Sequence, residues 1–216
     1  MIYLCDVTPL LDPVCFAGLL PLVSRERREK ITALPPEKEK CRTLAAGLLL
    51  RQVCRDYGIR DDTLGYGQQG KPYFEAYRDI HFNLSHSGMR AMCAVDSRPL
   101  GCDVQERRKV SPALLKKALS QREYDWCMEQ ADPEDAFFRL WVRKESYLKA
   151  TGLGLSQPLD SFSVQLPGEM LFDKGVKYAL FGWQEPPYYF ALCQQDRLTD
   201  QECRMIDLKT QKAEAL

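Results

Sequence analysis

The 216-residue sequence lacks the features that define several protein classes. None of its nine cysteines forms a CxxC pair and only two histidines occur, which excludes a zinc ribbon, a dithiol redox motif and a histidine-rich metal site. Its longest apolar run, Leu44–Leu50, is far shorter than the ~18 residues that a membrane span needs. Thirty basic residues balance thirty acidic ones, so we expect neither a nucleic-acid partner nor a membrane anchor.

The composition that remains is that of a globular protein, with 45% hydrophobic and 28% charged residues. An odd number of cysteines predicts free thiols that act as small core residues in a reducing compartment, so we expect a cytoplasmic protein. The first residues are apolar, but they have no basic leader and are interrupted by Asp6 and Asp12. We expect a strand and a loop there rather than a signal peptide.

Two long helices are predicted from periodic apolar residues and from their end signals. The first covers residues 36–57, with Pro36 in its first turn and Gly58 as its stop. The second begins at Pro133 and ends at Gly152. Each helix therefore lies in a different half of the chain.

The predicted strands are distributed in the same way. Short apolar runs separated by turn residues predict strands between residues 73 and 104, and alternation at Phe162, Val164 and Leu166 predicts a later one. Helices and then strands occur twice along the chain. We therefore predict an α+β fold made of two similar halves, residues 1–102 and 103–216.

Gly65–Gly70 matches the GxGxxG pattern of dinucleotide-binding loops. That motif requires a helix to open at the third glycine, whereas Lys71-Pro72 and a predicted strand follow here. We interpret the segment as a loop, with Lys71 available to a phosphate.

Two polar positions interrupt apolar strands. Ser85 and His86 lie at a predicted strand end, which is typical of site residues but also of a polar hairpin turn. Asp103 lies inside the apolar run GCDV, where a carboxylate is costly unless it is paired or binds a metal. Gln105 shares its face of the strand. A salt bridge to one of the basic residues at 107–109 is an equally good interpretation for Asp103.

The second long helix places a carboxylate among apolar side chains. Glu145 continues the stripe formed by Phe138 and Trp141, and Lys149 follows four residues later. An exposed pair at this spacing contributes only about 0.2–0.5 kcal/mol and belongs on a polar face. A ligand or metal between the two side chains explains their position better.

Together these segments resemble the Sfp-type 4′-phosphopantetheinyl transferases over nearly the whole chain. The specific matches, in the family's order and spacing, are HFNLSHSG at 81–88, GCDV at 101–104 and WxxKESxxK at 141–149, which GLGL follows at 152–155. The resemblance implies a pseudo-dimer of two α+β halves with the active site in the cleft between them. It implies transfer of the phosphopantetheine arm of coenzyme A to a carrier-protein serine, which releases adenosine 3′,5′-bisphosphate.

The resemblance also implies roles for individual residues. Mg²⁺ would be held by Asp103 and Glu145, with Gln105 as a third ligand. Glu145, Lys149 and His86 would be catalytic, with Glu145 taking the serine proton and the other two holding the pyrophosphate. The expected contacts to coenzyme A are Arg27, Lys30, Arg42, Lys71, Ser85, His86 and Lys149.

One position departs from the family pattern, because an acid is usual where Gln105 stands. A neutral amide predicts weaker Mg²⁺ binding, unless a bulge in the strand turns Glu106 inward. Gln105 is also the one feature that supports a catalytically impaired relative that binds coenzyme A or a carrier protein without turnover. A hydrolase that passes the same phosphorus to water is a third hypothesis.

The implied protein partner is an acyl or peptidyl carrier protein, an acidic helical domain whose serine lies at a helix N-terminus. Residues 110–128 carry apolar side chains that suit either a docking surface or core packing. The pseudo-dimer implies a monomer.

Overall fold

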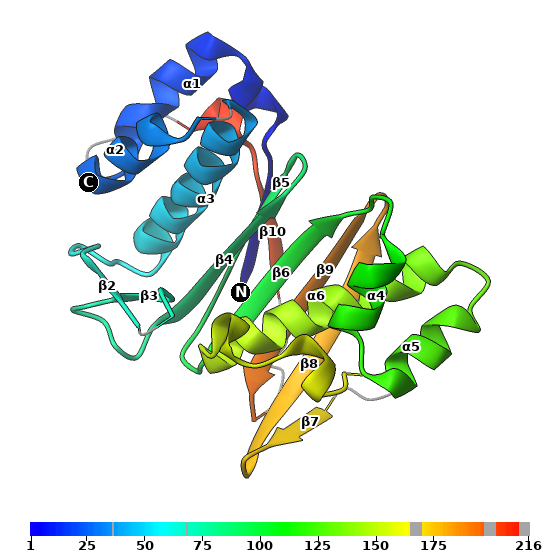
Figure 1. Cartoon of the computed structure of the whole chain (residues 1–216). Helices are drawn as coiled ribbons and strands as arrows, with labels where there is room; N and C mark the ends of the chain where they lie inside the picture. Colours follow the sequence, from blue (N-terminus) through cyan, green and yellow to red (C-terminus); the bar gives the residue numbers. More distant parts are fainter. Residues whose placement is uncertain (36, 68, 165–169, 197–201, 212–216) are drawn as a thin grey trace.

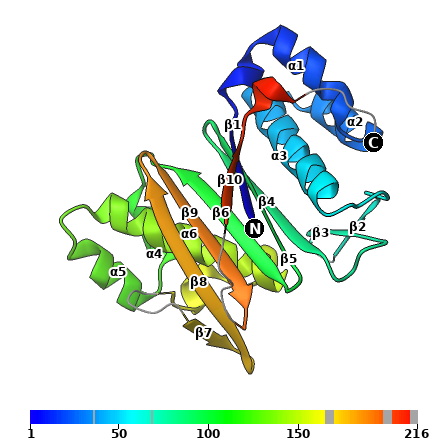
Figure 2. The ribbon, with the colours of Figure 1, turned by 180° about the vertical axis from the view of Figure 1, so that it is seen from behind.

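The structure, a computed structural model, describes residues 1–35, 37–67, 69–164, 170–196 and 202–211. Two four-stranded sheets form its centre, and each is covered by a long helix (Figures 1 and 2). This arrangement confirms the predicted α+β class. Among the described residues, none of the helices has the length and apolar character required to cross a membrane.

The N-terminal sheet contains, in spatial order, β10 (Cys203–Ile206), β1 (Ile2–Asp6), β5 (Arg90–Asp96) and β4 (His81–Ser87). Neighbouring strands are antiparallel except β10, which runs parallel to β1. A separate hairpin is formed by β2 (Leu64–Tyr66) and β3 (Pro72–Phe74). The connection between these two strands therefore agrees with the loop expected at the GxGxxG pattern, although Gln68 lies outside the described residues.

Three helices accompany this sheet: α1 (Pro13–Leu19), α2 (Arg25–Ala33) and α3 (Glu37–Asp56). The long helix α3 agrees with the helix expected over 36–57, and Pro36 lies outside the described residues. Its apolar face, including Leu44, Leu48 and Val53, packs on one face of the sheet. Burial of this face is the main favourable contribution to the N-terminal core.

The C-terminal sheet contains β6 (Leu100–Glu106), β9 (Tyr188–Gln195), β8 (Val176–Glu185) and β7 (Met170–Asp173), all antiparallel to their neighbours. The helices of this part are α4 (Pro112–Ala118), α5 (Gln121–Met128) and α6 (Pro133–Thr151). Helix α6 begins after the N-cap Asp132 and ends at Gly152, whose φ of 71° is left-handed, as expected from the sequence.

The two sheets pack against each other through a third apolar cluster. Ile2 and Met92 on the N-terminal sheet meet Cys102 and Phe190 on the C-terminal sheet. Because side chains alternate along a strand, the opposite faces of the two sheets remain for α3 and α6. The order of layers is α3, N-terminal sheet, C-terminal sheet and α6.

The division expected after residue 102 does not follow the architecture. It falls inside β6, all of which belongs to the C-terminal sheet. Strand β10, near the other end of the chain, pairs with β1, and Leu208 is buried in the N-terminal core. The predicted boundary is therefore corrected: the last described residues belong to the N-terminal layer. Tertiary pairing, and not order along the chain, decides which sheet a strand joins.

Two local predictions were wrong. The loop expected after β1 contains a 3₁₀ turn (Thr8–Leu11) and α1, because the Asp12 side chain accepts the Val14 N–H at 3.0 Å and caps the helix. Phe162 and Val164 lie in no strand. The backbone N–H of Val164 is instead bonded to a Glu123 carboxylate oxygen at 2.7 Å. Leu166, the third residue of that prediction, lies outside the described residues.

Candidate active site

Strands β4 and β6 are joined by a ladder of side-chain oxygens and backbone N–H groups. Three alternate residues of β4 each accept one bond from three alternate residues of β6. The pairs are Asn83 Oδ1 with Cys102 N–H (2.9 Å), Ser85 Oγ with Val104 N–H (3.2 Å) and Ser87 Oγ with Glu106 N–H (3.0 Å). The ladder holds the edges of the two sheets together at the point where Asp103 lies.

Asp103 is nearly buried, at 5% exposure, and forms an ion pair across the junction. Its Oδ1 atom lies 2.6 Å from Lys149 Nζ and accepts the Ser85 hydroxyl at 2.7 Å. Its Oδ2 atom is buried and has no hydrogen-bond partner within the part of the chain that the structure describes. Leaving a buried carboxylate oxygen without a partner is costly, so this atom is a candidate ligand for a cation.

The ion pair decides between the interpretations that the sequence left open. Asp103 pairs with Lys149, which is 46 residues away, rather than with a basic residue at 107–109. The ion pair that the structure describes for Lys149 is therefore with Asp103, and not with Glu145 four residues earlier on the same helix.

Close packing of α6 on β6 brings these groups together. A Cβ on Gly101 would lie 2.1 Å from the Ser146 carbonyl oxygen and 2.3 Å from the Ala150 nitrogen. Only glycine therefore lets the helix backbone approach the strand this closely. The same helix carries Glu145 and Lys149 toward Asp103.

Glu145 is half-buried beside this pair. Burial is the main reason that its pKa is raised, the Asp103 charge raises it further, and Lys149 acts in the opposite direction. For Lys149, burial is the largest single effect and favours the neutral amine, but Asp103, Cys102 and Glu145 together outweigh it, so the net pKa is raised. Lys149 therefore keeps its proton as an ammonium, whereas Glu145 takes up a proton at a higher pH than an exposed glutamate would.

The strand that carries Asp103 contains no bulge. Residues 100–106 pair one to one with 188–194 of β9, so alternation keeps Gln105 on the face of Asp103 and Glu106 on the other. Glu106 Oε1 accepts the Tyr188 hydroxyl at 3.2 Å. Of these two residues, Gln105 therefore shares the face of Asp103 and Glu106 does not.

The donor set suits a magnesium ion in part. Mg²⁺ prefers one or two carboxylates with phosphate and water oxygens, and Asp103 and Glu145 supply two carboxylates. The partnerless Asp103 Oδ2 is the observation that favours such an ion. Among the described residues, no group of three or more histidine, cysteine or acidic side chains could form a complete protein cage.

A cleft of about 350 Å³ opens beside Asp103 and is bordered by cations from helices α2 and α6. Its lining residues are Arg27, Lys30, Thr43, Ala46, Leu84, Ser85, His86, Asp103 and Lys149. Arg27 reaches it by lying across α3, where a Cβ on Gly47 would be 2.5 Å from the Arg27 Cδ atom. Burial lowers the pKa of Arg27, and an anion in the cleft would compensate that cost.

His86 and Arg42 meet at one acid that the sequence analysis missed. Arg42 Nη2 lies 2.6 Å from Glu39 Oε2, and His86 Nε2 lies 3.6 Å from Glu39 Oε1. Burial lowers the pKa of His86, Glu39 counteracts this, and Arg42 and Lys149 lower it further. Arg42 itself is held by Glu39 and does not line the cleft.

Lys71 is separated from the other predicted site residues. Its Nζ atom donates to the carbonyl oxygens of Leu100 (2.8 Å) and Ala150 (3.2 Å), so it joins the start of β6 to the end of α6. Burial lowers its pKa to about 8. The structure therefore brings together Arg27, Lys30, Ser85, His86, Asp103 and Lys149, with Glu145 and Gln105 beside them, but not Lys71.

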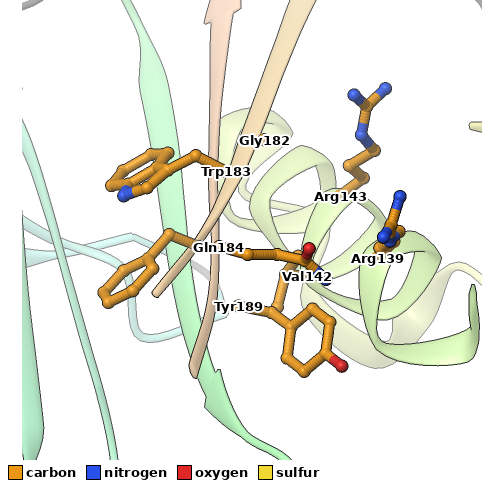
Figure 3. Close-up of a pocket in the computed structure, with 8 residues that line it drawn as sticks. Arg139, Val142, Arg143, Gly182, Trp183, Gln184 and Tyr189 are labelled. Atoms are coloured by element: carbon orange, nitrogen blue, oxygen red, sulfur yellow. The ribbon is translucent and has the colours of Figure 1, made fainter. Parts of the chain in front are cut away.

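A second pocket, of about 170 Å³, lies on another side of α6. Figure 3 shows Arg139 and Arg143 projecting together from the helix, with the Trp183 ring on the opposite side of β8. Arg139 Nε is paired with Asp135 at 2.7 Å. This pocket contains none of the residues of the cleft. We place the candidate site at Asp103 because its partnerless carboxylate oxygen lies beside the cations of the cleft.

Three residues near the site, Asn83, Ser87 and Glu39, were not predicted from the sequence. The alternation of Asn83, Ser85 and Ser87 was a visible signal, because polar groups on one face of an otherwise apolar strand require partners. Glu39 offered no such signal, since acidic residues are common in the first turn of a helix.

Comparison with known proteins gives consistent matches. The model of the 4′-phosphopantetheinyl transferase superfamily matches residues 99–187, which include Asp103, Glu145 and Lys149. The chain is 40% identical over 153 residues to a 4′-phosphopantetheinyl transferase of Bacillus subtilis and 39% identical over 152 residues to the transferase Sfp of B. subtilis strain 168. Each alignment covers 68% of both chains. Among solved structures, the holo-acyl-carrier-protein synthase of Thermotoga maritima aligns over 46% of this chain and 64% of its own, with 17% identity and a TM-score of 0.36.

Proposed function

Because this chain belongs to the Sfp-type 4′-phosphopantetheinyl transferases, we propose that its cleft transfers the phosphopantetheine arm of coenzyme A to a serine of an apo carrier protein. The observation that carries the assignment to this cleft is the partnerless, buried Oδ2 of Asp103 beside a row of cations. The carboxylate oxygen needs a positive charge nearby, and the cations of the cleft need a negative one. A pyrophosphate with a divalent cation supplies both charges.

Asp103 and Glu145 are the residues that would hold Mg²⁺, with the Gln105 amide oxygen as a neutral third donor. When bound, the ion offsets the negative charge that develops on the pyrophosphate oxygens during transfer. The partnerless carboxylate oxygen supports this role for Asp103.

Glu145 is the proposed base. The serine oxygen forms a bond to the phosphorus next to pantetheine, and the bond from that phosphorus to the bridging oxygen breaks, so that adenosine 3′,5′-bisphosphate leaves. The serine proton passes to the Glu145 carboxylate, directly or through a water.

The cations of the cleft are proposed to hold coenzyme A. Lys149 and His86 would contact the pyrophosphate, and Arg27 and Lys30, which approach from α2, would contact the 3′-phosphate. Roles for Arg42, Lys71 and Ser85 stay predictions. For Lys71 to contact coenzyme A, its ammonium would have to leave the two carbonyl oxygens that it now contacts.

The proposed partner is an acidic, helical acyl or peptidyl carrier protein, and the proposed location is the cytoplasm. Nine free cysteines support a reducing compartment. No observation favours the impaired relative over an active transferase.

Intact-protein mass spectrometry tests the proposal. An apo carrier protein is incubated with the chain, coenzyme A and Mg²⁺, and we expect the mass of one phosphopantetheine to be gained and the gain to be lost with EDTA. Asp103→Asn, which keeps the side chain's shape, should remove the gain as well. No gain by the wild-type chain with carriers of several classes would contradict the proposal.

A further inference from the structure

Lys149 uses its full hydrogen-bonding capacity inside the protein. An ammonium group has three N–H donors, and all three have acceptors here. They are Asp103 Oδ1 (2.6 Å), Ser85 Oγ (3.0 Å) and the Cys102 carbonyl oxygen (3.2 Å). A phosphate oxygen that binds this ammonium must therefore replace at least one of these acceptors.

Asp103 depends on the same contact. Its Oδ1 receives the Lys149 and Ser85 bonds, its Oδ2 receives none, and its side chain is almost fully buried. The Lys149 ammonium thus supplies the positive charge nearest to this carboxylate. A divalent cation at Asp103 would lie close to that ammonium and be repelled by it.

The other cations of the cleft do not share this arrangement. Arg27 and Lys30 line the cleft from α2, and Arg42, which lies outside the cleft lining, is paired with Glu39. Among the cations in the described ranges, Lys149 is the one that forms an ion pair with Asp103. Lys149 therefore provides a route by which an anion and a cation at this site can be coupled, in addition to their direct attraction.

We propose that Lys149 couples the binding of the two ligands: a pyrophosphate draws its ammonium away from Asp103, and a divalent cation then takes its place. This inference rests on the proposed function, which supplies the pyrophosphate. The pyrophosphate removes the ammonium that repels the cation, and the cation replaces that ammonium at Asp103. The two ligands therefore bind with positive cooperativity, and thermodynamic linkage requires the effect to be reciprocal.

The first experiment measures cation binding without coenzyme A. Mn²⁺ is the probe and electron paramagnetic resonance reports the free ion. Lys149→Met should bind Mn²⁺ more tightly than the wild type, by about 5- to 150-fold, the usual range of such couplings. Lys30→Met is the matched control, because it removes one positive charge from the same cleft but no bond to Asp103, and its affinity should change much less. Equal or weaker Mn²⁺ binding by Lys149→Met would overturn the proposal.

The second experiment approaches the pair from the other side and does not depend on the stability of Lys149→Met. Coenzyme A binding is measured by calorimetry in EDTA. Asp103→Asn should bind coenzyme A more tightly than the wild type, because its Lys149 is no longer held by a carboxylate. Glu145→Gln removes a nearby negative charge without touching the Lys149–Asp103 pair, so its gain should be smaller. Equal gains in both variants would indicate a general charge effect and contradict the proposal.

Neither binding experiment contains a carrier protein, so they separate two kinds of failure. Transfer by the wild type with no difference between variants would refute the coupling and leave the function standing. The expected differences in binding without any transfer would support the coupling and refute the proposed function.

Discussion

Helix α6 carries two lysines that each form a short ion pair with a carboxylate from another element. Lys144 Nζ lies 2.7 Å from Glu123 Oε2, and Lys149 Nζ lies 2.6 Å from Asp103 Oδ1. By distance alone the two pairs are equivalent. They differ in burial and in what else each carboxylate contacts.

The Lys144–Glu123 pair is closed. Both side chains have 0% exposure, Lys144 also donates to two backbone carbonyls, and both Glu123 oxygens accept backbone N–H groups. The Lys149–Asp103 pair is open, because it borders the cleft and Asp103 Oδ2 has no partner in the described residues. A buried pair with every atom satisfied holds elements together, whereas one with a spare oxygen can bind something else.

The largest expected effect comes from the acid beside the open pair. Glu145→Gln keeps the side chain's shape but cannot take the serine proton, so transfer should fall by about 10²- to 10⁴-fold. Single-turnover transfer followed by mass spectrometry measures it, and an unchanged melting temperature serves as the control. Activity within a few-fold of the wild type would show that Glu145 is not the base.

Breaking the closed pair should affect stability instead. Lys144→Met leaves the Glu123 charge buried without its cation, which should lower the free energy of unfolding by about 3–5 kcal/mol. Urea unfolding gives this value. In the double variant Lys144→Met, Glu123→Gln part of the loss should be recovered, since no unpaired charge remains and the amide oxygen can still accept a backbone N–H. A loss below about 1 kcal/mol in the single variant would mean that the pair contributes little.

A third lysine sharpens the comparison because it has carbonyl partners but no described carboxylate. Burial lowers the pKa of Lys71 from its ordinary 10.5 to about 8, so the unfolded chain binds more protons than the folded one between these values. Wild-type stability should therefore rise relative to Lys71→Met as the pH increases from 8 to 10.5, by up to about 3 kcal/mol.

Urea unfolding of both proteins at pH 7 and pH 10 checks this sign. Below pH 8 the full cost of burying the charge is present in the wild type and absent from Lys71→Met. A difference between the two proteins that does not vary with pH would contradict the lowered pKa.

The smallest effect concerns the charge of the open site. Gln105→Glu adds a carboxylate on the face of Asp103, so the Mg²⁺ concentration for half-maximal transfer should fall, on the order of several-fold. Glu106→Gln is the matched control, because this side chain lies on the opposite face and contacts Tyr188. An unchanged Mg²⁺ requirement in Gln105→Glu would show that this position does not contact the ion.

The sequence by itself determined features that depend on neighbouring residues. The Ser120–Glu123 capping box, formed by two residues three positions apart, starts α5, and Gly152 ends α6. The α+β class followed from apolar periodicity, and the family resemblance followed from three motifs in register. Such signals extend over only a few residues, so the local chain contains all the groups that form them.

Only the tertiary structure decided how distant groups are paired. The sequence placed Lys149 near Glu145 and left Lys71 available to a phosphate, whereas the fold directs Lys149 to Asp103 and Lys71 to two carbonyls. It also returned β10 to the N-terminal sheet. These partners come from elements far apart in the chain, and their contacts depend on how closely α6 packs on Gly101, which no local pattern encodes.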